Sequence, residues 1–191
     1  MAQGKRNNFS SRFWRGFWRD PRVRLATARM FFRGTPHGQH LGFRVRKVEP
    51  RAVEAEMPYR DDLVGNPWTG TLHAGPVITL LDQTCGTCAS LSMNPPWIVA
   101  TLDLRVDYLR PAEPGRTLRA RAETYRVTRE IVFLRGEVHD GTSDTAVATC
   151  MATFMRTRPL IKNPVKGLRK LWSISRQSNR PAQKPQDRDA A

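Results

Sequence analysis

Hydrophobic and polar residues alternate through most of the middle of the chain. The first two alternating stretches, residues 41–49 and 52–58, flank a Pro50-Arg51 turn and predict a β-hairpin. Four longer stretches predict strands over Ile98–Leu109, Thr117–Thr128, Ile131–Asp140 and Thr145–Arg156. Short polar turns separate the last three of them, so an antiparallel meander is expected.

One segment between the hairpin and the long strands follows a helical period instead. Its apolar positions are Val77, Leu80, Leu81, Thr84 and Cys88. Pro76 suits the first position of this helix, because its missing N–H is not needed there. The run 93–96, Met-Asn-Pro-Pro, ends the helix. A loop rich in Asp, Gly, Asn and Pro precedes it, and the chain as a whole is predicted to be α+β.

Asp82 does not fit the apolar pattern of this helix. It lies about two turns inside an apolar segment, where burying a carboxylate is costly. Ahead of it, the turn at Ala74-Gly75-Pro76 offers backbone N–H groups at a helix N-terminus, which favours negative charge. A carboxylate and an anion-stabilising turn on one element are the parts of a site that activates water.

Two motifs resemble the PaaI-like branch of the hotdog-fold acyl-CoA thioesterases. The first is Gly70-Thr71-Leu72-His73 with an acidic residue, Asp82, nine positions after the histidine. The second is the stretch 100–112, which resembles the family strand that ends in Tyr-Leu-Arg-Pro. The resemblance covers roughly residues 40 to 156. It implies a hotdog fold, in which an antiparallel sheet wraps a long central helix.

The resemblance also implies roles for individual residues. Asp82 would be the general base that activates water, or alternatively the nucleophile, and the Gly75 N–H would stabilise the oxyanion. His73 would fix the turn or touch the substrate. The residues expected to contact acyl-CoA are Asn66, Thr101, Arg110 and Arg129. No metal or cofactor is expected.

Two departures from the family pattern bear on these roles. Ala74 replaces the first glycine of the usual pair after the histidine, and Asn66 lies seven residues before His73, one more than usual. Other functions therefore stay open. One is a hotdog-type enoyl-CoA hydratase, although the aspartate and asparagine spacing of that class is absent. Another is a non-catalytic acyl-CoA-binding module tethered to a membrane.

The net charge of +15 is confined to the two ends of the chain. Residues 1–36 and 156–191 each carry a net +8, whereas residues 37–155 carry −1. The near-neutral middle offers no groove for nucleic acid. We expect an N-terminal extension over 1–36, a thioesterase domain over 37–156 and a C-terminal extension over 157–191, with disorder from Gln177.

Both extensions combine basic residues with an apolar helical face. Phe9, Phe13, Trp14, Phe17 and Trp18 alternate with arginines, in a helix that ends at Asp20-Pro21; a second basic, apolar segment spans Val23 to Phe32, and another face spans 165–175. Two interpretations of the N-terminal pattern remain open. The segment binds an anionic membrane surface, or it packs its aromatic rings on the domain.

The sequence has three cysteines and no apolar run long enough to span a membrane. Cys85 and Cys88 lie within the apolar helix, and Cys150 is apart from them, so buried structural thiols are expected rather than a zinc site. We therefore expect a cytoplasmic protein with peripheral membrane attachment through its tails. Because the family's sites lie between subunits, the resemblance also implies a homodimer or homotetramer.

Overall fold

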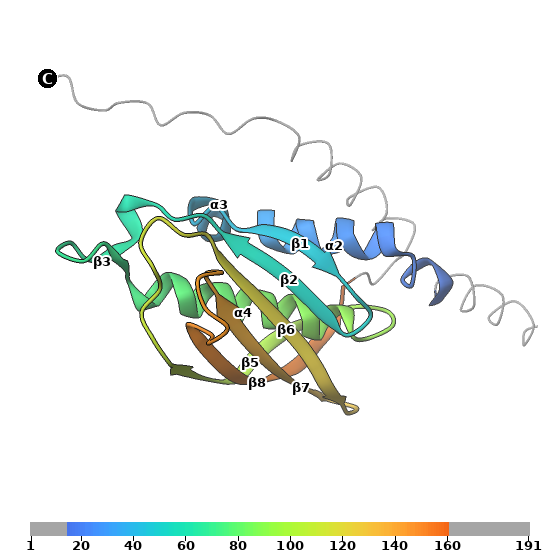
Figure 1. Ribbon diagram of the computed structural model, residues 1–191. Helices are drawn as coiled ribbons and strands as arrows, with labels where there is room; N and C mark the ends of the chain where they lie inside the picture. The colour runs from blue at the N-terminus through green and yellow to red at the C-terminus, as the bar shows by residue number, and fades with distance from the viewer. Residues whose placement is uncertain (1–14, 161–191) are drawn as a thin grey trace, which may run out of the picture.

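A six-stranded antiparallel sheet packs against one long helix (Figure 1). The computed structural model describes residues 15–160. Its elements are α2 (Pro21–Arg33), α3 (Pro36–His40), β1 (Arg44–Val48), β2 (Ala52–Met57), the 3-10 turn η1 (Asp61–Leu63), β3 (Val64–Asn66), β4 (Thr71–Leu72), α4 (Ala74–Leu91), β5 (Trp97–Tyr108), β6 (Leu118–Val127), β7 (Ile131–His139) and β8 (Ala148–Pro159). In this part of the chain no helix is long and apolar enough to cross a bilayer.

The strand order is β1-β2-β6-β7-β8-β5, and every neighbouring pair is antiparallel. The predicted strands therefore exist, with bounds that differ by a few residues. The expected meander is formed by β6, β7 and β8, which follow one another along the chain and in the sheet. β5 pairs with β8 from Trp97↔Pro159 to Tyr108↔Ala148, which makes β5 an edge strand of the sheet. Alternation within a strand does not encode which strand lies beside it.

Helix α4 confirms the predicted apolar face and corrects the predicted start. Val77, Leu80, Leu81 and Cys88 are all buried against the sheet. The helix begins at Ala74 rather than at Pro76, because His73 acts as its N-cap. Pro76 is therefore the third helical residue, where a backbone N–H still has no partner inside the helix, so its absence costs nothing.

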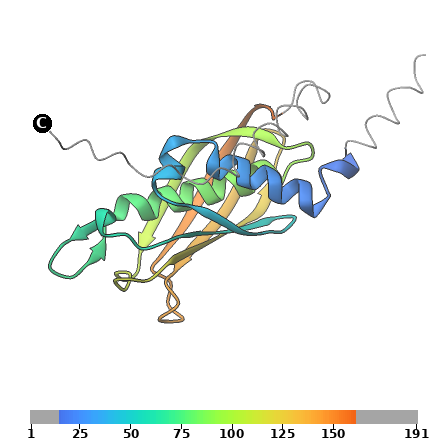
Figure 2. The ribbon, with the colours of Figure 1, turned by 90° about the horizontal axis from the view of Figure 1, so that it is seen from above.

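Helix α2 is part of the same hydrophobic core. Its N-cap is Asp20, whose carboxylate accepts the Arg22 N–H, and Pro21 is its first residue. Asp20 and Pro21 thus begin α2, directly after a short helical turn at 15–17. Ala28 and Phe32 are fully buried, with the Phe32 ring edge-on to Phe43. Figure 2 shows α2 lying beside α4.

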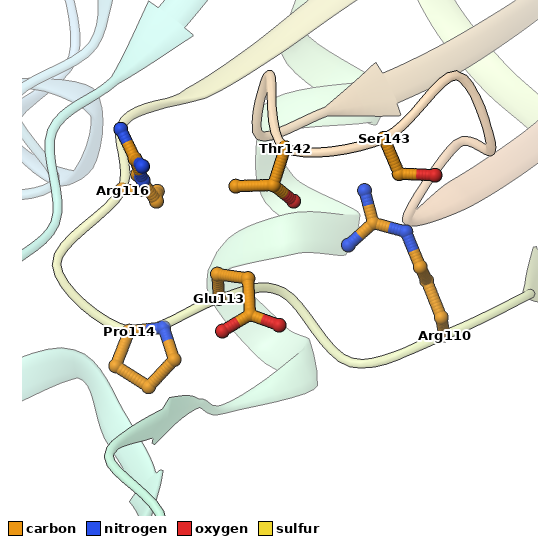
Figure 3. A pocket seen from close by; sticks show the side chains of 6 residues that line it. All are labelled: Arg110, Glu113, Pro114, Arg116, Thr142 and Ser143. Carbon is orange, nitrogen blue, oxygen red and sulfur yellow. The ribbon is translucent and has the colours of Figure 1, made fainter.

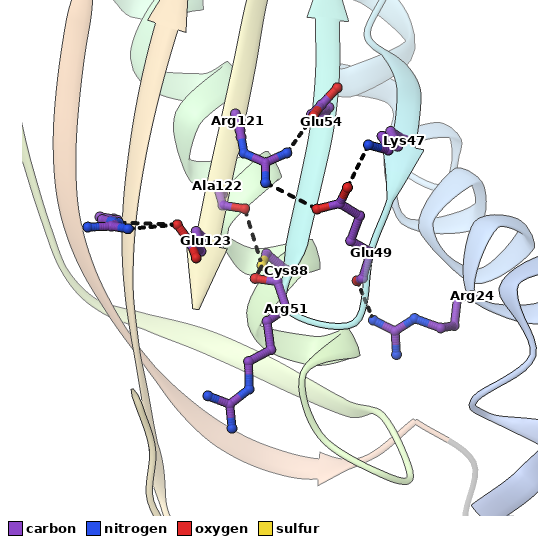
Figure 4. Close-up of polar contacts among 10 residues, drawn as sticks. Arg24, Lys47, Glu49, Arg51, Glu54, Cys88, Arg121, Ala122 and Glu123 are labelled. Atoms are coloured by element: carbon purple, nitrogen blue, oxygen red, sulfur yellow. Dashed lines mark hydrogen bonds and ion pairs between the residues drawn. The ribbon is translucent and has the colours of Figure 1, made fainter. Parts of the chain in front are cut away.

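The guanidinium of Arg24 fastens α2 to the rest of the fold. It donates to the Leu91 carbonyl at the end of α4 (2.8 Å) and to the Glu49 carbonyl in the β1–β2 turn (2.8 Å; Figure 4). Burial lowers the pKa of Arg24. Beside it, Arg121 of β6 forms ion pairs with Glu49 and Glu54, which link β6 to the β1–β2 hairpin. Three segments that are distant in sequence therefore meet at one end of α4.

The structure tests the expectations for the two extensions only in part. Trp18 is 4% exposed and packs against its neighbour Phe17, so for this residue the packing interpretation holds. Phe9, Phe13 and Trp14 lie outside the described residues, and so do the helical face at 165–175 and the expected disorder from Gln177. The boundaries at 36/37 and 156/157 stay predictions. All three cysteines are buried, as predicted.

Candidate active site

Asp82 and Thr101 meet between α4 and the edge strand β5. The Thr101 hydroxyl donates a hydrogen bond of 2.9 Å to Asp82 Oδ1. Thr101 stands opposite the buried Phe154 in β8, so it lies on the face of the sheet that looks toward α4. Asp82 itself is only half-buried. The carboxylate is therefore oriented by a neutral donor while one oxygen, Oδ2, is left for another partner.

The turn before α4 presents backbone donors about two helical turns from Asp82. His73 Nδ1 accepts the N–H of Gly75 at 2.9 Å, which caps the helix. Pro76 has no N–H to offer. Among the residues that the structure describes, the Ala74 N–H has no acceptor. The donor available at this N-terminus is thus Ala74, whereas the sequence pointed to Gly75, whose N–H is occupied by His73.

The position of His73 is fixed by its backbone as well as by its side chain. Its N–H donates to the Leu63 carbonyl at 2.9 Å. Gly65 in β3 passes so close that a Cβ there would lie 2.7 Å from the His73 Cα. A glycine is therefore required at position 65, and the capping imidazole is held by the β3–β4 hairpin.

Tyr108 is a site residue that the sequence reasoning missed. Its hydroxyl donates to the carbonyl of Ala74 at 3.1 Å and so joins the end of β5 to the first residue of α4. Partial burial raises the pKa of Tyr108, so the phenol keeps the proton that it donates. A signal was available: Leu104, Val106 and Tyr108 repeat at every second position, which places the tyrosine on the face toward α4.

Arg110 has a partner within the fold. Its guanidinium forms two hydrogen bonds of 2.7 Å with the carboxylate of Asp140, whose side chain is completely buried. These bonds hold the pKa of Asp140 well below its ordinary value. Arg110 also lines a cavity of about 500 Å³ with Glu113, Pro114, Arg116, Thr142 and Ser143 (Figure 3). A role for Arg110 toward coenzyme A phosphates stays a prediction, and Asp140 would compete with it.

The structure does not bring Asn66 and Arg129 to Asp82. Asn66 Oδ1 accepts the N–H of Trp68 at 3.1 Å, so this side chain shapes the tip of the β3–β4 hairpin. Arg129 pairs with its neighbour Glu130 in the β6–β7 turn, and 90% of its side chain is exposed. That turn follows the part of β6 that contacts the C-terminal end of α4, so Arg129 and His73 lie at opposite ends of the helix.

Comparisons with known proteins match the region that carries these residues. A family model described as "Thioesterase superfamily" matches residues 69–147. A thioesterase family protein of known structure from Silicibacter pomeroyi is 31% identical, with a TM-score of 0.63 and an alignment that covers 71% of this chain and 98% of that one. The chain belongs to the thioesterase superfamily. It is a thioester hydrolase by family.

Two further proteins are similar to this chain. The medium/long-chain acyl-CoA thioesterase YigI of Escherichia coli is 26% identical over 139 residues, which are 66% of this chain and 88% of YigI. The PaaI protein of Escherichia coli, 16% identical, has a TM-score of 0.65 over 73% of this chain and 96% of PaaI. The predicted hotdog fold and the PaaI-like resemblance are therefore confirmed.

Several large hydrophobic side chains of this thioesterase are exposed on or next to α4 and β5, the elements that carry Asp82 and Thr101. Trp68 in the β3–β4 hairpin, Ile78 on α4, Leu102 and Tyr108 on β5, and Leu109 directly after β5 are 40–92% exposed. Asp82 lines neither the cavity at Arg110 nor the one between α2 and β1.

Proposed function

We propose that this thioesterase hydrolyses acyl-CoA thioesters to the free acid and coenzyme A. The observation that carries the proposal is the placement of Asp82, fixed by Thr101, on the helix whose N-terminus has the unpaired Ala74 donor. The name of YigI, a medium/long-chain acyl-CoA thioesterase, supports the substrate class. Medium-chain and long-chain acyl-CoAs are therefore the first substrates to assay.

The geometry supports a mechanism with a general base and one backbone oxyanion donor. Asp82 takes a proton from water, and the water oxygen forms a bond to the thioester carbonyl carbon. The negative charge that develops on the carbonyl oxygen is stabilised by the Ala74 N–H at the positive end of α4. Collapse of this intermediate breaks the carbon–sulfur bond, and the coenzyme A thiolate leaves. His73, which caps the helix, keeps the turn in place.

We propose that two copies pair along β5 to complete the site, in a homodimer or in a homotetramer built from such dimers. β5 is a 12-residue edge strand, and an edge of this length exposes backbone groups that pair readily with another strand. Leu102 and Leu109, each about half exposed, lie along or just beyond it. Pairing would cover these side chains and bring residues of the second copy to the Asp82 site.

The remaining expectations concern location and the basic tails. We propose a cytoplasmic enzyme, on the support of three buried cysteines that are all free thiols. We also propose that the basic tails hold it at an anionic membrane surface. Most of both tails lies outside the described residues, so this proposal rests on their sequence.

Release of free thiol from a panel of acyl-CoAs tests the proposed reaction. A hydrolase produces one thiol per acyl-CoA consumed, whereas a hydratase changes an enoyl-CoA without releasing thiol, and a binding module does neither. The hydratase alternative is not favoured by the family match. Thiol release that depends on enzyme concentration would support the proposal, and its absence over the whole panel would contradict it.

A further inference from the structure

Four arginines line a second cavity, which lies between α2 and β1. Arg29 and Arg33 come from α2, and Arg44 and Arg46 come from β1, around a volume of about 400 Å³. Residues four apart on a helix share one face, which places Arg29 and Arg33 together on α2. Arg44 and Arg46 both line the cavity from β1, where a shift of register against β2 follows Val45. We call this feature the arginine groove.

The lining of the groove is mainly polar and has little compensating charge. At its base, the buried rings of Phe32 and Phe43 pack edge to face with centroids 6.3 Å apart. The only acidic residue that lines it is Glu56, 15% exposed, which forms an ion pair with Arg46. The lining thus carries a net +3, although residues 37–155 as a whole carry −1.

Two of the guanidinium groups are available to a ligand. Arg29 and Arg44 are exposed, and neither forms an ion pair or a side-chain hydrogen bond with another described residue. Like charges that converge repel each other, and an anion that enters between them removes this penalty. Guanidinium groups match the oxygens of phosphate with pairs of parallel N–H donors. The chemistry therefore fits a phosphate group.

We propose that the arginine groove binds the phosphates of anionic phospholipid headgroups and docks the enzyme on a membrane. The groove opens at the β1 edge of the sheet, opposite the β5 edge, so a copy paired along β5 leaves it uncovered. An exposed basic surface suits a bilayer interface that carries anionic headgroups.

Co-sedimentation of the full-length chain with lipid vesicles tests this proposal. The vesicles contain phosphatidylcholine alone or phosphatidylcholine with phosphatidylglycerol. The double variant Arg29→Gln/Arg44→Gln removes two charges from the groove. The control is the double variant Arg126→Gln/Arg158→Gln, which changes the net charge by the same amount outside the groove. Both arginines are exposed, and neither forms an ion pair within residues 15–160.

The groove variant should partition about 30-fold more weakly into anionic vesicles, since each basic residue near the surface contributes about 1 kcal/mol. The matched control should lose only a few-fold. Thermal unfolding followed by circular dichroism and thiol release in free solution should be unchanged in both variants, because none of the four residues contacts the Asp82 site.

Five results would overturn the proposal. The wild type does not bind anionic vesicles; the two variants lose binding equally, which means that only net charge matters; or the groove variant binds as well as the wild type. The fourth is that inorganic phosphate, at an ionic strength matched with chloride, displaces the wild type from the vesicles, which identifies a site for small phosphorylated molecules. Loss of RNA binding without loss of vesicle binding in the groove variant would likewise assign the groove to nucleic acid.

Discussion

Replacement of Asp140 by asparagine should destabilise the fold substantially. The carboxylate accepts five hydrogen bonds: two from Arg110, two from Thr142 and one from the Glu113 N–H, at 2.7–3.1 Å. They join the segment after β5 to the turn between β7 and β8, and the Asp140 side chain has no exposed surface. An amide keeps the shape but turns one acceptor into a donor that faces guanidinium or backbone N–H groups.

The structure sets the size of this effect. Removing one partner of a buried ion pair costs about 3–5 kcal/mol, because the other partner stays in place without its counter-charge. Arg110 keeps 20% of its side chain in solvent and still donates to the Thr145 carbonyl, so the lower part of this range applies. We expect Asp140→Asn to lower the free energy of unfolding by about 3 kcal/mol, which corresponds to a melting temperature lower by about 6–12 °C.

Denaturant unfolding monitored by tryptophan fluorescence measures this difference, with Asp144→Asn, an exposed residue in the same turn, as the control. The effect should depend on pH with a definite sign. The Asp140 pKa is depressed in the folded state, so its contribution is complete above the unfolded-state pKa of about 3.9 and declines as the pH falls below it. The gap between wild type and Asp140→Asn should therefore shrink in acid. A loss below about 1 kcal/mol at neutral pH, or a gap that widens in acid, would refute the reasoning.

Three further predictions concern the active site and the β5 edge. Thr101→Val should lower kcat about 10-fold, because Asp82 loses its orienting donor, while Thr101→Ser should stay near wild type; equal kinetics for the two variants would remove the positioning role. Ala74→Pro deletes the proposed oxyanion N–H at a first helical position, which tolerates proline, and should lower kcat by about 10²–10³-fold, whereas Ala74→Gly should change kcat modestly. If steady-state kinetics show that the proline variant is as active as the glycine variant, the oxyanion is bound elsewhere. Leu102→Arg should shift the protein toward monomer in analytical ultracentrifugation, whereas Met151→Arg in β8, an exposed residue away from the β5 edge, should not. An unchanged oligomer in the Leu102 variant would exclude pairing along β5.

The pattern of the sequence predicted the elements well because burial on one face dictates the alternation. Each long alternating stretch became a strand, and the apolar positions Val77 to Cys88 became the buried face of α4. The contact between Asp82 and Thr101 also joins two residues that sequence reasoning had singled out. Each of the two was singled out because it lies in a motif of the family, but their contact was not predicted.

The rest depended on partners that no local pattern specifies. The neighbour of β5 is decided by how the whole sheet closes, so the pairing with β8 was not foreseen. The partner of Arg110 lies 30 residues away at Asp140, and nothing near either residue indicates the pair. The cap by His73, which occupies the Gly75 N–H and leaves Ala74 as the donor, needs the side-chain geometry of the turn.

Thiol release by Asp82→Asn is the decisive measurement of whether Asp82 is the general base. This variant is nearly isosteric and can still accept the hydrogen bond from Thr101, but its amide cannot take a proton from water. With acyl-CoA as substrate, we expect kcat to fall at least ~10²-fold, the usual contribution of a positioned general base. Asp103→Asn, exposed on the outer face of β5, should keep wild-type turnover. An Asp82→Asn enzyme that folds normally and hydrolyses acyl-CoA at the wild-type rate would contradict the account.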